Sequence, residues 1–277
     1  MPGSARLSAT ASTTGAMPVT DTVQQAIDVA AVQRRSLRVL SSGAVLGGIA
    51  VAGSIPAGAL LAASIADSEA AAGLAQTSGV VGAALLALPL ARIALSRGRR
   101  DSLASGYAIG AAGGVVVIAA SLARSLPFLL LGCLLVGVAS AAGYQARYAA
   151  TDLATEDHRA RALAWVVWAS TIGAVLGPNL LAASGALGLA VGIPQLAGPY
   201  LVSTVALALA AIVLLLFLRP DPYLVSVAGR STERARTPRV RDGIAHLRGR
   251  PLAVLGIGAI SIGHVVMVMV MVMTPVH

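Results

Sequence analysis

Residues 91–103 read ARIALSRGRRDSL and place four arginines between two long apolar stretches. About twenty residues without any charge precede this cluster, and another apolar run follows it at once. Arginine is retained on the cytoplasmic side of a membrane, so a basic segment between two apolar runs is typical of a short connection between membrane-spanning helices. The segment therefore predicts a chain that crosses a lipid bilayer several times.

The composition supports the same interpretation. Hydrophobic residues make up 57% of the chain, charged residues only 11%, and the mean hydropathy is +0.83. A water-soluble domain carries about 25% charged residues, so this chain has too little charge to cover a globular surface. Cys133 is the single cysteine, so an internal disulfide is excluded. It lies inside an apolar run, which indicates a small core residue.

Seven apolar segments are each roughly 20 residues long or longer, the length that a helix needs to cross about 30 Å of hydrocarbon. None of them contains an aspartate or a glutamate. We therefore expect an all-α membrane protein, a polytopic helical bundle with about seven transmembrane helices. The expected spans are 40–63, 70–92, 103–122, 126–146, 162–186, 198–218 and 252–273.

The remaining segments complete a four-part organisation. Residues 1–38 are expected to form a cytoplasmic tail, residues 39–218 a six-helix bundle, residues 219–251 a basic cytoplasmic linker, and residues 252–277 a seventh helix. Within the tail, residues 22–38 have the apolar spacing of a short amphipathic helix on the membrane surface. The same residues are equally typical of a solvated lead-in to the first span.

The distribution of arginine predicts the orientation. All 20 basic residues are arginines, and 19 of them lie in segments on one side of the predicted membrane; Arg124 alone lies on the other. By the positive-inside rule, the N-terminus is therefore cytoplasmic. A net charge of +9 would also suit a nucleic-acid-binding protein, but no aromatic residues alternate with the arginines, so we expect a lipid bilayer and no nucleic acid as the partner.

The basic connection resembles a motif of the major facilitator superfamily of transporters. The family pattern, G-x-L-A-D-R-x-G-R-R, lies between spans two and three. The matching residues here are Ile93, Ala94, Gly98, Arg99 and Arg100, followed by the apolar Leu103. The sequence departs from the pattern at Ala91, Leu95 and Ser96, and Leu95 replaces a carboxylate that in the family helps to hold the outward-facing state. The alternative is that these arginines act only as topology signals.

The segment from Arg147 to Pro178 resembles the same family. In the superfamily a basic residue, an aspartate and an arginine connect spans four and five, and a G-x-x-x-G-P motif follows. The corresponding residues are Arg147, Asp152, Arg159 or Arg161, Gly173, Gly177 and Pro178. Two glycines four residues apart leave a groove that a second helix backbone can approach closely, and the proline is expected to kink the helix.

The resemblance implies a secondary active transporter, which moves a small molecule across the cytoplasmic membrane by alternating access between two six-helix halves. It also implies that the glycine motif of span five packs against the second half. With seven expected spans, the chain is interpreted as a fragment or truncated product: the N-terminal half and the start of an incomplete second half. The alternative function is a non-transporting membrane protein, such as a seven-helix receptor or scaffold. No enzyme is expected, because no catalytic arrangement of residues is recognisable.

Polar residues inside the spans are the candidates for contact with a substrate. They are Gln76, Thr77, Tyr144, Gln145, Thr171, Asn179 and His264. Each is equally suited to a hydrogen bond between helices. His264 could couple transport to protons, since imidazole gains and loses a proton near neutral pH, or it could be a neutral residue bonded to a neighbouring helix.

We expect no cofactor and no metal. The alternating methionines Met267, Met269, Met271 and Met273 raise the alternative of a Cu(I) site, since thioether sulfur is a soft ligand. On a helix, however, Met267 and Met271 lie on nearly the opposite face from Met269 and Met273, so the four cannot converge on one ion. Flexible apolar packing explains them better.

Overall fold

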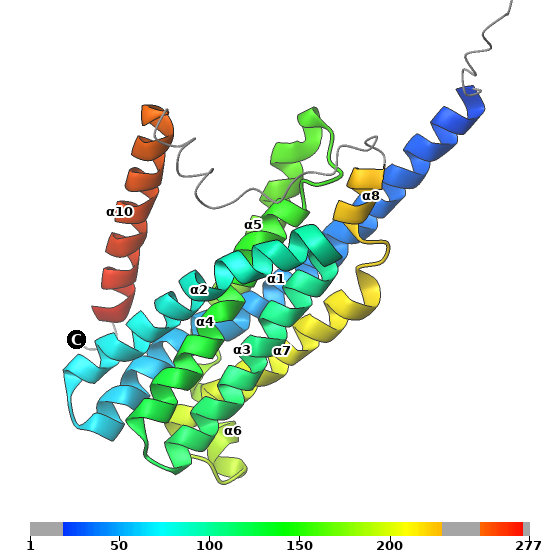
Figure 1. The fold of residues 1–277 in the computed structure, drawn as a ribbon. Coiled ribbons are helices and arrows are strands. Elements are labelled where there is room, and N and C mark those ends of the chain that lie inside the picture. Colours follow the sequence, from blue (N-terminus) through cyan, green and yellow to red (C-terminus); the bar gives the residue numbers. More distant parts are fainter. Residues whose placement is uncertain (1–18, 229–249, 274–277) are drawn as a thin grey trace, which may run out of the picture.

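The computed structural model describes residues 19–228 and 250–273, and every regular element in these residues is helical (Figure 1). Six helices in this part of the chain are long and apolar enough to cross a membrane, which confirms the predicted polytopic bundle. The elements are α1 (Val19–Ala66), α2 (Glu69–Arg97), α3 (Arg99–Leu122), α4 (Leu126–Ala149), α5 (Glu156–Asn179), α6 (Leu181–Ala190), the 3-10 turn η1 (Gln195–Ala197), α7 (Gly198–Phe217), α8 (Pro222–Ala228) and α10 (Pro251–Met273). The last of these lies at the position of the predicted seventh span.

Helix α1 is longer than predicted. It continues without interruption for 48 residues, so the boundary expected between a surface helix at 22–38 and a span at 40–63 is absent. The stretch from residue 22 to residue 42 contains no glycine or proline, and nothing in it breaks a helix. At about 1.5 Å per residue the helix is roughly 72 Å long, about twice the thickness of the hydrocarbon core, and one end extends past the other helices (Figure 1).

The predicted fifth span, 162–186, is divided between two helices. Helix α5 begins earlier, at Glu156, where two acidic residues in the first turn interact favourably with the positive end of the helix dipole. It ends at Asn179, one residue after Pro178, and the separate helix α6 starts at Leu181. Proline lacks the backbone donor of the helical ladder, and a single residue, Leu180, separates the two helices.

Glycines allow α1 and α5 to pack closely. A Cβ atom added to Gly173 would lie 2.9 Å from the Cα of Gly48, and one added to Gly177 would lie 2.7 Å from the nitrogen of Gly53. No real side chain fits at these distances. The two glycines of α5 therefore contact α1 of the same bundle, whereas the family resemblance implied a helix of the second half.

The buried core lies between α1, α3, α4 and α7. Its largest fully buried side chains include Tyr107 and Leu103 of α3 and Tyr200 and Leu207 of α7. Two hydrogen bonds tie α7 to α1 inside this core: the Tyr200 hydroxyl donates to the carbonyl of Ser54 at 3.0 Å, and the Ser203 hydroxyl donates to that of Ala50 at 2.9 Å. Buried backbone carbonyls thus help to fix the register of the two helices.

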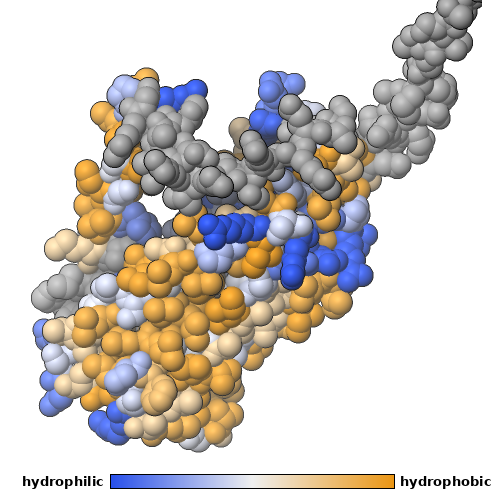
Figure 2. Space-filling model, in the orientation of Figure 1, coloured by the Kyte–Doolittle hydropathy of each residue, from blue (hydrophilic) through white to orange (hydrophobic). Residues whose placement is uncertain are grey.

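The outer surface of the bundle is apolar. Figure 2 shows hydrophobic side chains over most of the visible face, with hydrophilic ones near the two ends of the bundle. Leu85, Trp168 and Val175 are 60%, 69% and 59% exposed, which would be unfavourable in water and is expected in lipid. Helix α10 stands apart from the other helices in Figure 1, and Leu252 and Ile260 are among its highly exposed residues.

We predict that Gly173→Leu lowers the thermal stability of the purified protein. The added side chain would meet the backbone of α1, and overpacking of this kind costs about 1–3 kcal/mol or more. Gly73→Leu is the matched control, because a Cβ on Gly73 of α2 meets nothing within 4 Å. The fluorescence of Trp165 and Trp168 on α5 can follow unfolding in detergent. Equal effects of the two substitutions would contradict the packing described here.

Candidate functional site

Gly98 forms the turn between α2 and α3. It ends one helix and begins the next with a φ of 101°, a left-handed conformation that strongly favours glycine. A Cβ atom at this position would also lie 2.7 Å from Cγ of Asp221. The Asp221 carboxylate in turn accepts a hydrogen bond at 2.8 Å from the backbone N–H of Arg100, at the N-terminus of α3. Both the turn and the contact beside it therefore require glycine.

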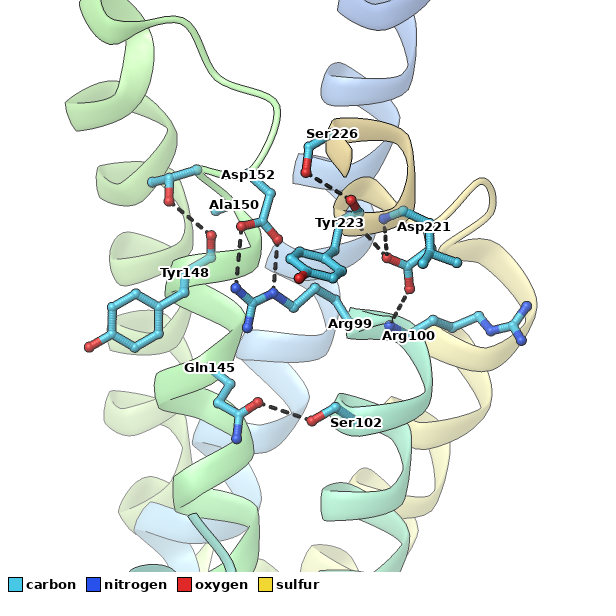
Figure 3. A network of polar contacts seen from close by, with 12 residues as sticks. Arg99, Arg100, Ser102, Gln145, Tyr148, Ala150, Asp152, Asp221, Tyr223 and Ser226 are labelled. Carbon is cyan, nitrogen blue, oxygen red and sulfur yellow. Dashed lines mark hydrogen bonds and ion pairs between the residues drawn. The ribbon is translucent and has the colours of Figure 1, made fainter. Parts of the chain in front are cut away.

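Arg99 connects three segments that are distant in the sequence (Figure 3). Its Nε donates to Asp152 Oδ2 at 2.8 Å and its Nη2 to Asp152 Oδ1 at 3.3 Å. The same guanidinium lies 5.5 Å from the centre of the Tyr223 ring on α8. Arg99, Asp152, Asp221 and Tyr223, with the Gly98–Arg100 turn, are called the end network below. It fastens the α2–α3 turn to the α4–α5 connection and to α8.

Burial affects the charge on Asp152. Partial desolvation raises the pKa of this carboxyl above its ordinary range, the hydrogen bonds and positive charge of Arg99 lower it, and the charge of Asp221 raises it again. The net shift is upward. The carboxyl thus takes up a proton at a higher pH than an exposed aspartate does, and protonation removes the ion pair with Arg99.

The side chains of the other predicted loop residues take no part in this network. Within the described part of the chain, the side chain of Arg100 pairs only with its neighbour Asp101, at 3.0 Å. Arg159 and Arg161 are exposed on α5 and form no salt bridge with any residue that the structure describes. The side chain of Arg147 lies over the Tyr144 ring, 5.1 Å from its centre, and lines a cavity.

Sequence reasoning missed Asp221 and Tyr223. Both lie in the stretch PDPY, which directly follows the sixth span and was assigned to the linker as a whole. The available signal is an aspartate beside the sixth apolar run, next to a proline that can begin a helix.

A cavity of about 440 Å³ lies between α1, α2, α4, α5 and α10. Of the polar candidates, Gln76, Tyr144 and His264 line it. Serines that the sequence analysis did not single out also line it: Ser54, Ser140 and Ser170. The lining consists mostly of glycine, alanine and valine, and Arg147 is its one permanently charged residue among those the structure describes.

The remaining polar candidates bond to their own helix or to a neighbour. Thr77, Thr171 and Asn179 donate to backbone carbonyls four residues earlier, at 2.8, 3.0 and 2.6 Å. Gln145 is buried and its Oε1 accepts a hydrogen bond from the Ser102 hydroxyl at 3.0 Å (Figure 3). None of these four lines the cavity.

The described residues contain no group of three His, Cys, Asp or Glu side chains that could hold a metal ion. Of the four alternating methionines, Met267 lines the cavity and Met269 is 65% exposed. The side chains of Met271 and Met273 lie outside the described residues.

We predict an energetic coupling of about 1–3 kcal/mol between Arg99 and Asp152 in a double-mutant cycle of Arg99→Gln and Asp152→Asn. Both side chains are only about 15% exposed, so removing one leaves the other charge partly desolvated. The matched control is the Arg100–Asp101 pair, which is about 30% exposed and should couple by less than about 1 kcal/mol. The measurement is the free energy of unfolding in mixed micelles, and equal coupling in the two pairs would contradict the prediction.

We also predict that this coupling declines as the pH falls, and that the decline begins above the ordinary aspartate range, because burial raises the pKa of Asp152. The total stability of the fold changes in the opposite direction: the contribution of Asp152 to the free energy of unfolding rises as the pH falls. The folded state binds this proton more tightly than the unfolded state, so Asp152 contributes stability at low pH that is lost as the pH rises through the raised pKa. A coupling that persists into the ordinary aspartate range would contradict the upward shift.

Comparison with known proteins identifies the family. The family model of the Major Facilitator Superfamily matches residues 40–277. Two uncharacterized MFS-type transporters of Bacillus subtilis, YddS and YdeG, are 38% and 36% identical over 248 residues, which is 88% of this chain and 56% and 57% of theirs. The riboflavin transporter RfnT of Brucella anthropi is 39% identical over 101 residues, 36% of this chain and 25% of its own.

No solved structure matches the chain significantly. The chain spans about half the length of the two Bacillus relatives that it matches. The extent of the family match confirms the resemblance seen around Gly98 and Gly173, and it confirms that the protein is not an enzyme. The chain belongs to the major facilitator superfamily, a family of multi-pass membrane transporters.

Proposed function

We propose that the chain forms the first half of a secondary active transporter, which moves a small molecule across the cytoplasmic membrane by alternating access. The observation that carries the proposal is the cavity between α1, α2, α4, α5 and α10, because a transporter binds its substrate in a space between helices near the middle of the membrane. Gln76 and Tyr144 are its proposed substrate contacts. His264, on the α10 side, is the proposed residue for proton coupling.

The end network supports a switching role at one end of the bundle. It holds the α2–α3 turn, the α4–α5 connection and α8 together through hydrogen bonds and a cation–π contact at the bundle end. Such polar contacts can break and re-form as the halves move, because water is available to the freed groups. We propose Gly98, Arg99, Arg100 and Asp152 as switch residues.

We further propose that α10 begins a second half. The two Bacillus relatives extend well beyond the matched region, and α10 contacts the bundle only slightly, along α1. The exposed apolar faces of α2, α5 and α10, with Leu85, Trp168 and Ile260, would pack against further helices or lipid. Residues 219–251 would then link the halves.

The proposed orientation has the N-terminus and the end network in the cytoplasm. The arginines of the α2–α3 turn and of the α4–α5 connection lie at the network end, and retention of arginine on the inner side favours this arrangement.

The experiment that tests this function uses chemical labelling in a Cys133→Ala background, which removes the single native thiol. Ser140→Cys places a thiol on the cavity wall. Val175→Cys is the control, since Val175 is 59% exposed on the apolar face of α5 and does not line the cavity. A membrane-impermeant thiol reagent is added to intact cells and, separately, to inside-out vesicles.

Alternating access predicts that Ser140→Cys is labelled from both faces and Val175→Cys from neither. Adding Asp152→Asn should increase labelling from the face of the end network, because the substitution breaks the ion pair with Arg99. Labelling of Ser140→Cys from one face only would contradict alternating access and favour a receptor or scaffold.

A further inference from the structure

We propose that the ligand of the cavity is a small organic monoanion with a flat apolar body, and that Arg147 binds its negative group. This inference deepens the proposed function and rests on it. It joins three observations: the sign of the charge in the cavity, the unsatisfied state of Arg147, and the shape and chemistry of the remaining walls.

The first observation is the sign of the charge. No aspartate or glutamate lies among the described residues that line the cavity, and Arg147 is the only permanently charged one. Arginine keeps its proton in proteins even when it is partly buried. The cavity therefore presents a fixed positive charge without a carboxylate to neutralise it, and it favours anions over cations.

The second observation is that Arg147 has no hydrogen-bond or salt-bridge partner among the residues that the structure describes. Its Nε is buried and makes no hydrogen bond, and the described residues offer it no salt bridge. Arg99, by contrast, donates two hydrogen bonds to Asp152. Arg147 is half-buried in the last turn of α4, and a buried donor of a charged group that stays unsatisfied is costly. Charges that lie against the apolar part of a membrane protein usually serve function.

The contact with Tyr144 gives Arg147 a defined position. The guanidinium carbon lies 5.1 Å from the ring centre, which is within the range of a cation–π interaction. A cation–π contact does not use the N–H groups of the guanidinium in conventional hydrogen bonds, so these groups remain able to bind an acceptor. A planar carboxylate or sulfonate can accept two such bonds side by side.

The third observation concerns the other walls. Glycine, alanine and valine dominate the lining, and tyrosine rings add flat surfaces to it. The glycines include Gly47, Gly58, Gly79, Gly137 and Gly143. An aromatic or alicyclic body of moderate size would bury apolar surface there, and the volume of about 440 Å³ limits how large it can be.

These features together favour a monoanion over a dianion. One guanidinium balances one negative charge, and a second negative charge would be desolvated without a permanent counter-ion in the described lining. The hydroxyls of Ser54, Ser140 and Ser170 can accept or donate further hydrogen bonds but add no charge.

The test compares three probes of nearly equal shape and different charge: naphthalene-2-carboxylate, 2-naphthamide and protonated 2-naphthamidine. Binding to the full chain is measured by titration calorimetry in nanodiscs of phosphatidylcholine. We expect the carboxylate to bind at least about tenfold more tightly than the amide, because a hydrogen bond to a charged group contributes more than a neutral one. The amidine should bind most weakly.

The variants assign any preference to one side chain. Arg147→Gln should abolish the preference for the carboxylate, and Arg147→Lys should retain part of it. Arg92→Gln is the matched control, since Arg92 is an exposed arginine on α2 that does not line the cavity, and it should leave the preference unchanged. A preference for the amide or the amidine, or a carboxylate preference that survives Arg147→Gln, would overturn the proposal.

A second measurement needs no substitution of Arg147. In the Cys133→Ala background, naphthalene-2-carboxylate should slow the labelling of Ser140→Cys. At the same concentration, 2-naphthamide should have no effect on this labelling. Equal protection by both probes would overturn the proposal. Repeating the binding in nanodiscs that contain phosphatidylglycerol separates a soluble anion from a lipid headgroup: retained binding supports the proposal, and competition by the lipid contradicts it.

These outcomes are independent of the test of transport. Labelling of Ser140→Cys from both membrane faces does not depend on the charge of any ligand. If that labelling occurs and the carboxylate is not preferred, the substrate class is wrong and alternating access stands. If labelling occurs from one face only while the carboxylate is preferred, the cavity binds anions without transporting them.

Discussion

A chain surrounded by lipid can place charge at few positions, and this constraint governs the whole structure. Charged groups are stable at the ends of the helices, where water is available, or in pairs that satisfy one another. The end network follows both rules, because Arg99 and Asp152 pair with each other at the end of the bundle. Arg147, in the last turn of α4, follows the first rule only in part: its Nε is buried without a hydrogen-bond partner among the described residues, beside a cavity that contains no described carboxylate. The site that we propose for a substrate is therefore the place where the constraint is left unsatisfied.

The same solvent determines how the helices pack. Lipid chains are as apolar as leucine, so burial of apolar side chains gives little drive for helices to associate, and close contact between backbones becomes important. Gly48 and Gly173 bring α1 and α5 together, and Gly79 and Gly137 do the same for α2 and α4. These close contacts fix the positions of the helices around the cavity. The end network then ties the connections at one end to one another.

Much of the fold could be predicted from the sequence, because an apolar run of about 20 residues is a strong and local signal. The length of α1 and the end of α5 at Asn179 could not be predicted in this way. An absence of helix-breaking residues does not say where a helix such as α1 begins, and Pro178 does not by itself say where α5 ends. The site was harder to predict. Asp221 reaches Arg100 across more than a hundred residues, and only the folded chain brings them together. Whether Gln76 or Gln145 faces a cavity depends on the rotation of each helix, which the polar residue alone does not reveal.

The most direct test of this account locates the helix connections relative to the membrane. In the Cys133→Ala background, single cysteines are placed at Ser96 and Thr155, near the end network, and at Ser68 and Ser125, in the connections at the opposite end. Intact cells are then treated with an impermeant maleimide. The account predicts that the cysteines at Ser68 and Ser125 react and that those at Ser96 and Thr155 react only after the membrane is opened. Reaction of all four in intact cells, or the reverse pattern, would contradict it.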